Sequence, residues 1–192
     1  MSDKKILGII YDFAEILMTA VLAVTLVFAF GFKTSVVNGD SMKDTLHNGD
    51  TVIITAVNNT VEYGDVVVIS QPNILSKVLI KRVIATGGQT VTFDRLNRKV
   101  LVDGVPLSEP YIPEKMNFSP LMSGSITVPE GKIFVMGDNR NDSTDSRDPI
   151  IGFIDTRYVV GKVIYRVGDT HLFENDIIDD GHLQADRKKA AL

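Results

Sequence analysis

A loop segment near the N-terminus carries a serine whose neighbours suit nucleophilic chemistry. Residues 38–46 read Asn-Gly-Asp-Ser-Met-Lys-Asp-Thr-Leu, so that Ser41 lies before the first clear strand pattern. Gly39 allows close approach of the backbone, which an oxyanion site built from amide groups requires. A Gly-x-Ser sequence alone is weak evidence, because most serines in such loops form turns. Ser41 therefore needs a base from elsewhere in the chain.

Lys81 is the candidate for that base. In residues 77–84, Leu79, Lys81 and Val83 share one face of an expected strand, and Arg82 lies on the other. A lysine held between large apolar neighbours loses hydration, which lowers its pKa from about 10.4. The neutral amine could then take a proton from a serine hydroxyl. The alternative is an edge strand whose lysine and arginine reach solvent, and the strand alone favours that alternative.

A third segment, residues 137–149, is rich in aspartate and arginine and has no apolar side chain except its proline. Its alternating polar residues resemble a calcium loop, but an arginine occupies one ligand position and a serine replaces the required glycine. We therefore expect no metal site here. The density of opposite charges instead predicts an internally bonded loop, in which Asp145 and Arg147 pair with each other or with Arg82. Ser143 could then supply a hydroxyl that orients a catalytic amine.

The composition narrows the chemistry further. The chain of 192 residues has no cysteine, which excludes cysteine nucleophiles, disulfides and zinc–thiolate sites. Of its three histidines, His47 lies in an expected turn, and His171 and His182 lie in a polar C-terminal segment that would position a base poorly. The net charge of −4 and the lack of a basic stripe give no reason to expect a nucleic-acid partner.

An apolar segment precedes these residues. Positions 16–32 carry no charge, and with two further residues the segment approaches the roughly 20 that cross a bilayer. A buried core helix and a cleavable signal peptide are the alternatives, but residues 31–35 form a poor cleavage site. We therefore expect one retained transmembrane helix in the N-terminal unit, residues 1–33.

After position 33 the pattern predicts an all-β, barrel-like domain over residues 34–168. Short runs rich in valine and isoleucine are separated by glycine, proline, asparagine and aspartate, and no helical periodicity of useful length appears. Residues 169–192 form a polar tail that we expect to be solvated. The predicted strands are residues 51–57, 65–70, 77–85, 90–93, 99–102, 132–136 and 159–167.

Taken together, the three segments resemble the motifs of bacterial type I signal peptidase. Ser-Met-Lys-Asp-Thr-Leu at 41–46 is similar to the family's Ser-Met-x-Pro-Thr-Leu, and Lys-Arg-Val at 81–83 to its strand motif. Residues 137–147 match Gly-Asp-Asn-Arg-x-x-Ser-x-Asp-Ser-Arg without a gap, and Gly-Asp-Val-Val at 64–67 matches a further segment. The resemblance spans residues 10–167, and the motif at 137–147 is highly specific.

The resemblance implies a mostly β fold with a single N-terminal anchor. It also implies a membrane-bound serine endopeptidase that removes signal peptides from secretory preproteins by cleavage after small residues. No cofactor or metal is implied. We expect a monomer in the lipid bilayer of the cell membrane.

The resemblance also implies a role for each matched residue. Ser41 is the nucleophile, its backbone amide forms part of the oxyanion hole, and Lys81 is the general base. Ser143 orients the lysine, and Asp145 and Arg147 support the site through ionic contacts, with Arg82 as a further supporting residue.

Three positions depart from the family pattern. Asp44 replaces the usual proline, which loosens the turn after the nucleophile and adds a negative charge. Gly39 stands where some members carry a serine hydroxyl that donates to the oxyanion, so this site must use backbone donors or another group. Residues 86–89 replace a Leu-Pro-Gly-Asp-like turn, a change that we expect to be structural only.

Two other functions remain open at this point. A self-cleaving Ser–Lys protease of the kind found in repressor switches would have a DNA-binding helical domain where this chain has its apolar segment. An inactive anchored β-domain could act as a binding module, and the replacement of proline by Asp44 keeps that hypothesis open. The presence of both Ser41 and Lys81 favours the enzyme.

The N-terminal charges predict a topology that can be tested. Lys4 and Lys5 precede the apolar segment, and positive residues favour the cytoplasmic side of a span. Protease added outside intact spheroplasts should therefore digest the domain that follows Lys33. Protection of this domain until the membrane is opened would contradict the predicted orientation.

Overall fold

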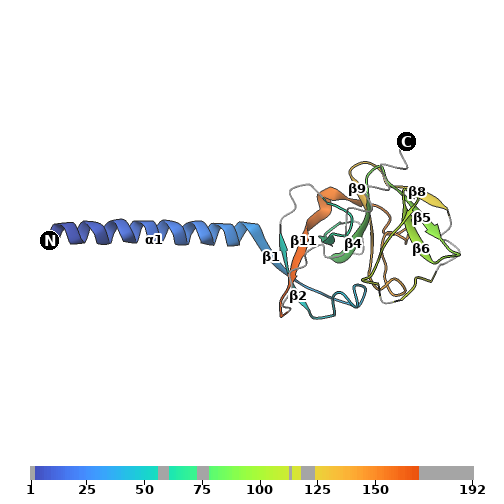
Figure 1. The fold of residues 1–192 in the computed structure, drawn as a ribbon, viewed down its shortest axis with the longest axis horizontal. Coiled ribbons are helices and arrows are strands. Elements are labelled where there is room, and N and C mark those ends of the chain that lie inside the picture. Colours follow the sequence, from blue (N-terminus) through green and yellow to red (C-terminus); the bar gives the residue numbers. More distant parts are fainter. Residues whose placement is uncertain (1–2, 56–60, 73–77, 113, 118–123, 169–192) are drawn as a thin grey trace. The chain divides into compact units, whose positions relative to one another are not determined.

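The computed structural model describes residues 3–55, 61–72, 78–112, 114–117 and 124–168. It divides into two compact units, Met1–Lys33 and Thr34–Leu192 (Figure 1). The predicted C-terminal tail, residues 169–192, lies outside the described residues.

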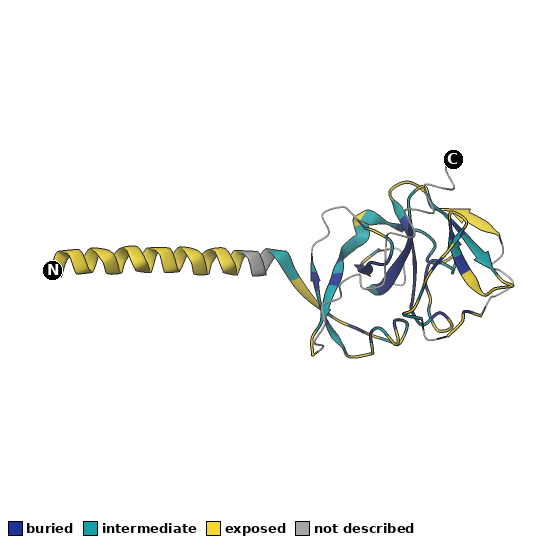
Figure 2. Cartoon of the chain, viewed as in Figure 1, coloured by how far each residue is buried: buried dark blue, intermediate teal, exposed yellow. Residues whose placement is uncertain are grey.

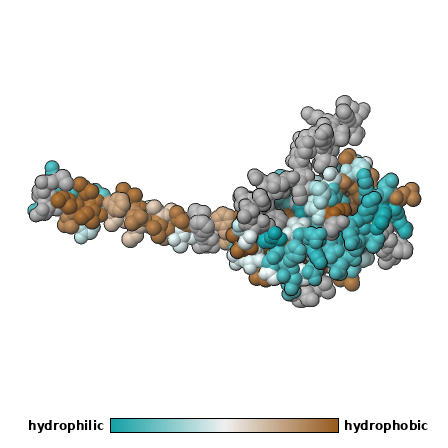
Figure 3. Space-filling model, turned by 60° about the horizontal axis from the view of Figure 1, so that its bottom comes forward, coloured by the Kyte–Doolittle hydropathy of each residue, from teal (hydrophilic) through white to brown (hydrophobic). Residues whose placement is uncertain are grey.

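The N-terminal unit consists mainly of the helix α1, Asp3–Gly31. Its large apolar side chains between Ile6 and Leu26 are 41% to 76% exposed (Figure 2). Figure 3 shows these hydrophobic side chains along the helix, whereas hydrophilic side chains cover much of the visible face of the β unit. At about 1.5 Å per residue, 29 residues span about 43 Å, which exceeds the roughly 30 Å hydrocarbon core of a bilayer.

The helix begins earlier than the charge-free segment 16–32 indicates. The stretch Lys4–Leu26 is long and apolar enough to cross a membrane, although it includes Asp12 and Glu15. Isolated charges do not interrupt the backbone hydrogen bonds of a helix, so the helix continues through them. At the other end, Phe32 belongs to the first strand and not to the helix.

The second unit contains two sheets, and every strand pair recorded in it is antiparallel. The larger is a curled, half-barrel sheet in the order β1-β2-β11-β3-β4-β9-β10, and the smaller has the order β7-β6-β5-β8. The mostly β, barrel-like fold is therefore confirmed. The larger sheet comprises β1 Phe32–Val36, β2 Thr51–Thr55, β3 Val66–Ile69, β4 Leu79–Thr86, β9 Lys132–Met136, β10 Ile154–Asp155 and β11 Val159–Arg166. The smaller comprises β5 Thr90–Asp94, β6 Lys99–Val102, β7 Val105–Pro106 and β8 Ser125–Thr127, and a 3-10 turn, Thr156–Tyr158, precedes β11.

The strand β4 lies inside the larger sheet, which overturns the edge-strand alternative. It pairs with β3 on one side, where Val67 lies opposite Lys81, and with β9 on the other. Lys81 and Arg82 are only 3% and 4% exposed, so neither side chain reaches solvent as an edge residue would. Long-range pairing, which local sequence does not encode, therefore decides the environment of both cations.

A bulge in β4 helps to close the core between the sheets. The register with β9 shifts between Val83 and Ala85, and the successive residues Ile84 and Ala85 both enter the same apolar cluster. Phe134 of β9 is the largest buried side chain of that cluster, with a ring centroid 6.2 Å from that of Phe93. Burial of one such ring contributes about 1.5–3 kcal/mol, so this core fixes β4 firmly in place.

Candidate active site

The loop that carries Ser41 leaves β1 and returns to β2. Val37 N donates to Asp50 O at 2.8 Å, and Gly49 N donates to Val37 O at 2.9 Å, which closes the base of the loop. Met42 and Leu46 are 1% and 0% exposed and belong to the core cluster beneath it. Because the side chain next to Ser41 is buried, the serine is held at the surface of the core with its hydroxyl toward a cleft.

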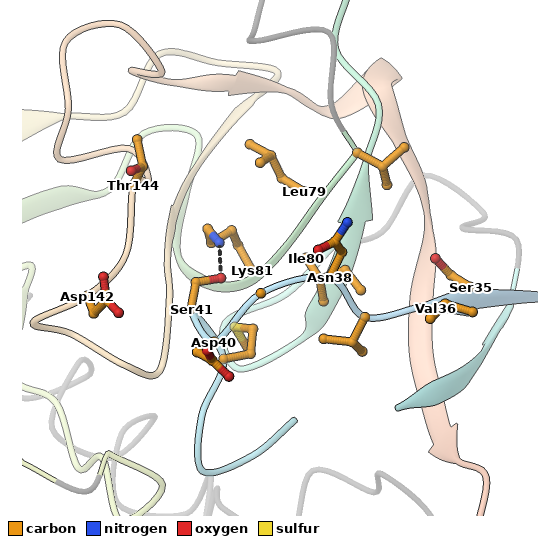
Figure 4. A pocket seen from close by; sticks show the side chains of 14 residues that line it. Ser35, Val36, Asn38, Asp40, Ser41, Leu79, Ile80, Lys81, Asp142 and Thr144 are labelled. Carbon is orange, nitrogen blue, oxygen red and sulfur yellow. Dashed lines mark hydrogen bonds between the residues drawn. The ribbon is translucent and has the colours of Figure 1, made fainter. Parts of the chain in front are cut away.

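Lys81 reaches the same cleft from β4. Its Nζ lies 2.6 Å from Ser41 Oγ, although 40 residues separate the two in sequence (Figure 4). Burial lowers the pKa of the Lys81 ammonium; Arg147 lowers it further, and Asp145 and Asp138 oppose that change. The structure therefore brings together a partly exposed hydroxyl and a buried amine whose neutral form is favoured.

The polar loop, residues 137–149, is internally bonded as the sequence predicts. Asp145 is fully buried and pairs with Arg147 through two contacts of 2.7 Å. Its Oδ2 also accepts hydrogen bonds from Gly137 N at 2.8 Å and from Ser143 Oγ at 2.7 Å. Burial alone would raise the pKa of Asp145, but the hydrogen bond and charge of Arg147 outweigh burial and lower it. The recorded hydrogen bond of the Ser143 hydroxyl is thus to Asp145 and not to Lys81.

Arg82 pairs with a different carboxylate, on the other side of β4. Its guanidinium donates to both oxygens of Asp138, at 2.9 and 2.7 Å, and to Gly64 O at 2.8 Å. Asp138 Oδ2 also accepts from Thr45 Oγ1 at 2.5 Å, which ties the turn after Ser41 to the polar loop. Neither Asp138 nor Thr45 was among the predicted site residues, although both lie within the matched motifs, which is the signal that could have identified them.

The two loops also meet through their backbones. Asn139 N donates to Ser41 O at 3.1 Å. A side chain at Gly137 would have its Cβ well under 3.0 Å from Ser41 O and from the Ser143 side chain. The absence of a side chain at position 137 is therefore what lets the polar loop lie against Ser41.

Two of the three departures from the family pattern lie in the loop that carries Ser41, and the third lies between β4 and β5. Gly39 has φ +99°, and its amide donates to Asn48 Oδ1 at 2.9 Å, so this N–H is already used within the loop. In the described part of the chain, the amide of Ser41 has no recorded acceptor. Asp44 is exposed and points away from the core. The turn at 86–89 joins β4 to β5 and is closed by Gln89 N donating to Thr86 O at 3.1 Å.

The cleft has a volume of about 630 Å³ and lies between the loop that carries Ser41, the start of β4 and the polar loop. Asp142 and Thr144 face it from the polar loop, and Leu79 and Lys81 from β4 (Figure 4). The polar ends of the lysine and serine thus open into a space that polar and apolar side chains line in similar numbers. The complete lining comprises Ser35, Val36, Val37, Asn38, Gly39, Asp40, Ser41, Met42, Val78, Leu79, Ile80, Lys81, Asp142 and Thr144.

Comparison with known proteins agrees with this geometry. A family model described as signal peptidase, peptidase S26, matches residues 10–167. The chain is 35% identical over 161 residues to a probable signal peptidase I-1 of Synechocystis, with 79% of each protein covered. It is 34% identical to a signal peptidase I of Bacillus licheniformis, with 79% of this chain and 85% of that protein covered.

Among solved structures, a signal peptidase I from Enterococcus faecalis V583 aligns with a TM-score of 0.45 and 29% identity, covering 54% of this chain and 96% of that one. The family assignment rests on the sequence matches, which cover most of the chain, and the family model spans all four matched motifs. The chain belongs to the signal peptidase family, peptidase S26.

Proposed function

We propose that this chain removes signal peptides from secreted preproteins, with Ser41 as the nucleophile and Lys81 as the general base. One observation carries the proposal: a buried amine, 3% exposed, lies 2.6 Å from the hydroxyl of a serine that faces a cleft. An amine at this distance can take the hydroxyl proton directly when it is neutral. Both relatives named above carry signal peptidase names, which gives the same substrate class.

In the proposed reaction, neutral Lys81 takes the proton from Ser41 Oγ as that oxygen attacks the scissile carbonyl. The amide of Ser41 donates to the oxyanion that develops. Lys81 then returns the proton to the leaving amine, and in the second half of the reaction it activates the water that hydrolyses the acyl-enzyme. The Ser143 hydroxyl donates its hydrogen bond to Asp145, which leaves the Ser143 oxygen as an acceptor that orients the lysine.

The dyad predicts a specific pattern of mutant activity. Ser41→Ala and Lys81→Ala should each lower kcat by about 10⁴-fold or more, and the double variant should be little worse, because residues that act as a unit are not additive. Lys81→Arg should be equally inactive, since a guanidinium stays protonated. In the wild type, the rate should rise with pH along a limb whose midpoint lies below the usual lysine pKa of 10.5.

His47 provides the control for this prediction. It is exposed in the turn before β2, where its amide is bonded to Asp50 Oδ2. Its replacement by alanine should leave most of the activity. Substantial turnover by Lys81→Arg would contradict the assignment of the dyad. The assignment would also be contradicted if His47→Ala were inactive while Lys81→Ala remained active. An inactive wild type that still binds preproteins would favour a binding module.

The contact between the two loops gives a second prediction. Gly137→Ala should lower kcat by about 100-fold or more, because its Cβ would push the Ser41 carbonyl and move the nucleophile. Gly161→Ala is the matched control, since its Cβ would meet Thr55 O equally closely within the sheet but away from the cleft. Both variants should lose thermal stability, and only Gly137→Ala should lose activity per folded molecule. Equal activities in the two variants would refute the positional role of Gly137.

The walls of the cleft support cleavage after small residues. Met42 and Ile80 line it and are 1% and 9% exposed, so both are packed into the core below. Because the core holds both side chains, the wall that they form next to Ser41 cannot easily withdraw to admit a larger substrate side chain. Together with the substrate class of the relatives, this fixed wall supports our proposal of a subsite for alanine-sized residues next to the scissile bond.

Substrate specificity can be measured with paired peptides. Replacing alanine by phenylalanine before the cut should abolish processing through steric exclusion, whereas serine, which is nearly as small, should be tolerated. The quantity to compare is kcat/KM for the three peptides. Similar values for alanine and phenylalanine would contradict the proposed subsite.

The family and the apolar N-terminal helix indicate a membrane-anchored protein. We further propose that α1 crosses the membrane once, with residues 34–168 as the catalytic domain on the extracytoplasmic side. The protein would act there as a monomer. This orientation places the cleft where preproteins emerge after translocation.

A further inference from the structure

A connection outside the matched motifs makes extensive contact with the back of the polar loop. Residues 107–117 lead from the small sheet toward β8, and we name them the strap; position 113 lies outside the described residues. Leu107 N donates to Val100 O at 2.9 Å, which fixes the start of the strap to β6. Met116 near its end is 1% exposed and belongs to the core between the sheets. Both ends of the strap are thus attached to the small sheet or its core.

The first contact is an ion pair. Glu109 accepts two hydrogen bonds from Arg140, at 3.0 and 2.5 Å, and the two side chains are 8% and 1% exposed. Arg140 Nε in turn donates to Gly137 O at 3.1 Å. Glu109 is therefore connected through a single arginine to the glycine that lies against the Ser41 carbonyl.

The second contact is a cation–π interaction. The guanidinium carbon of Arg82 lies 3.9 Å from the centroid of the Tyr111 ring, and the Tyr111 hydroxyl donates to Glu109 Oε1 at 3.1 Å. Arg82 holds Asp138, which accepts from Thr45 in the turn after the nucleophile. Tyr111 thus supports the same turn by a second route, which does not pass through Arg140.

The third contact joins the C-terminal part of the strap to the other end of the polar loop. Arg147 Nη1 lies 3.3 Å from Met116 Sδ, and Asn117 N donates to Asn141 Oδ1 at 2.8 Å. The three arginines of the matched motifs therefore each contact the strap. A loop without regular secondary structure has little intrinsic rigidity, and these contacts supply it.

We propose that the strap positions the polar loop against the Ser41–Lys81 pair, with Glu109 and Tyr111 as positioning residues. Neither residue lines the cleft, so both act through Arg140 and Arg82 and not on the substrate. The inference rests on the proposed function for its activity readout. On this proposal the small sheet anchors the strap, and the strap in turn holds the polar loop in position at the active site.

Loosening the strap should change how Lys81 titrates. The groups that act on its amine are Asp145, Arg147 and Asp138, and all three belong to the polar loop. A displaced loop would admit water to Lys81, which relieves the burial that lowers its pKa. The pKa would then move back toward 10.5, and the limb of the pH–rate profile would move to higher pH.

The test uses the full chain in detergent or lipid, with a signal-peptide substrate. Glu109→Gln removes the ion pair with little change in shape, and Tyr111→Leu removes the ring face. Each variant should lower kcat about tenfold or more with a smaller change in KM. Each should also shift the rising limb of the pH–rate profile to higher pH. Tyr111→Phe keeps the ring over Arg82 and should retain the wild-type limb. Asp155→Asn removes a similar two-contact pair with the exposed Arg157, and it should change neither kcat nor the position of the limb.

Stability is measured in parallel, because Glu109→Gln leaves a buried arginine without its partner. Lowered melting temperatures with unchanged kcat and an unchanged limb, measured well below unfolding, would overturn the positioning role. A shift in Tyr111→Phe as large as that in Tyr111→Leu would overturn the stacking contact. Failure of the proposed function would look different, since the wild type would then not cleave or Ser41→Ala would still cleave.

Discussion

The desolvation of one amine sets the requirements for the rest of this site. In the proposed reaction Lys81 is a base, and it can act as one only if its charged form is disfavoured; a carboxylate paired with it would restore that form. Two carboxylates lie near enough to influence it, but Asp138 is engaged by Arg82 and Asp145 by Arg147. The arginines therefore do more than balance charge. They occupy the acids that would otherwise hold the lysine protonated, so the nearest recorded partner of the amine is the Ser41 hydroxyl.

Buried ion pairs of this kind contribute little net free energy to stability, and their main effect is to fix the orientation of the paired side chains. Burying two charges removes their hydration, and their attraction often does no more than offset that loss. What a two-contact arginine pair provides is direction, because the planar guanidinium fixes the carboxylate in orientation as well as distance. The pairs of Arg82, Arg140 and Arg147 surround a loop that lacks regular secondary structure. These ion pairs restrain the loop in the way that backbone hydrogen bonds restrain an edge strand of a sheet.

The sequence predicts the elements better than it predicts their neighbours. Strands β6 and β9 are found at the predicted residues, because short apolar runs bounded by turn residues are local signals. The two-residue strands β7 and β10 are too short to leave a pattern, and their pairing depends on partners already in place. Lys81 could be identified as a possible base, yet the strand alone favoured an exposed edge. Its burial follows from β3 and β9 on either side, which no local pattern reveals.

The same dependence on distant contacts explains why Asp44 need not disturb the position of Ser41. A proline there would stiffen the turn locally, but the turn is held by contacts from outside itself: Met42 and Leu46 are buried in the core, and Thr45 is bonded to Asp138. Asp44 is exposed, so its charge is largely screened by water. A turn fixed by two buried side chains and one hydrogen bond depends little on the intrinsic stiffness of the residue between them. The position of Ser41 is therefore a property of the assembled domain, as is the pKa of the lysine beside it.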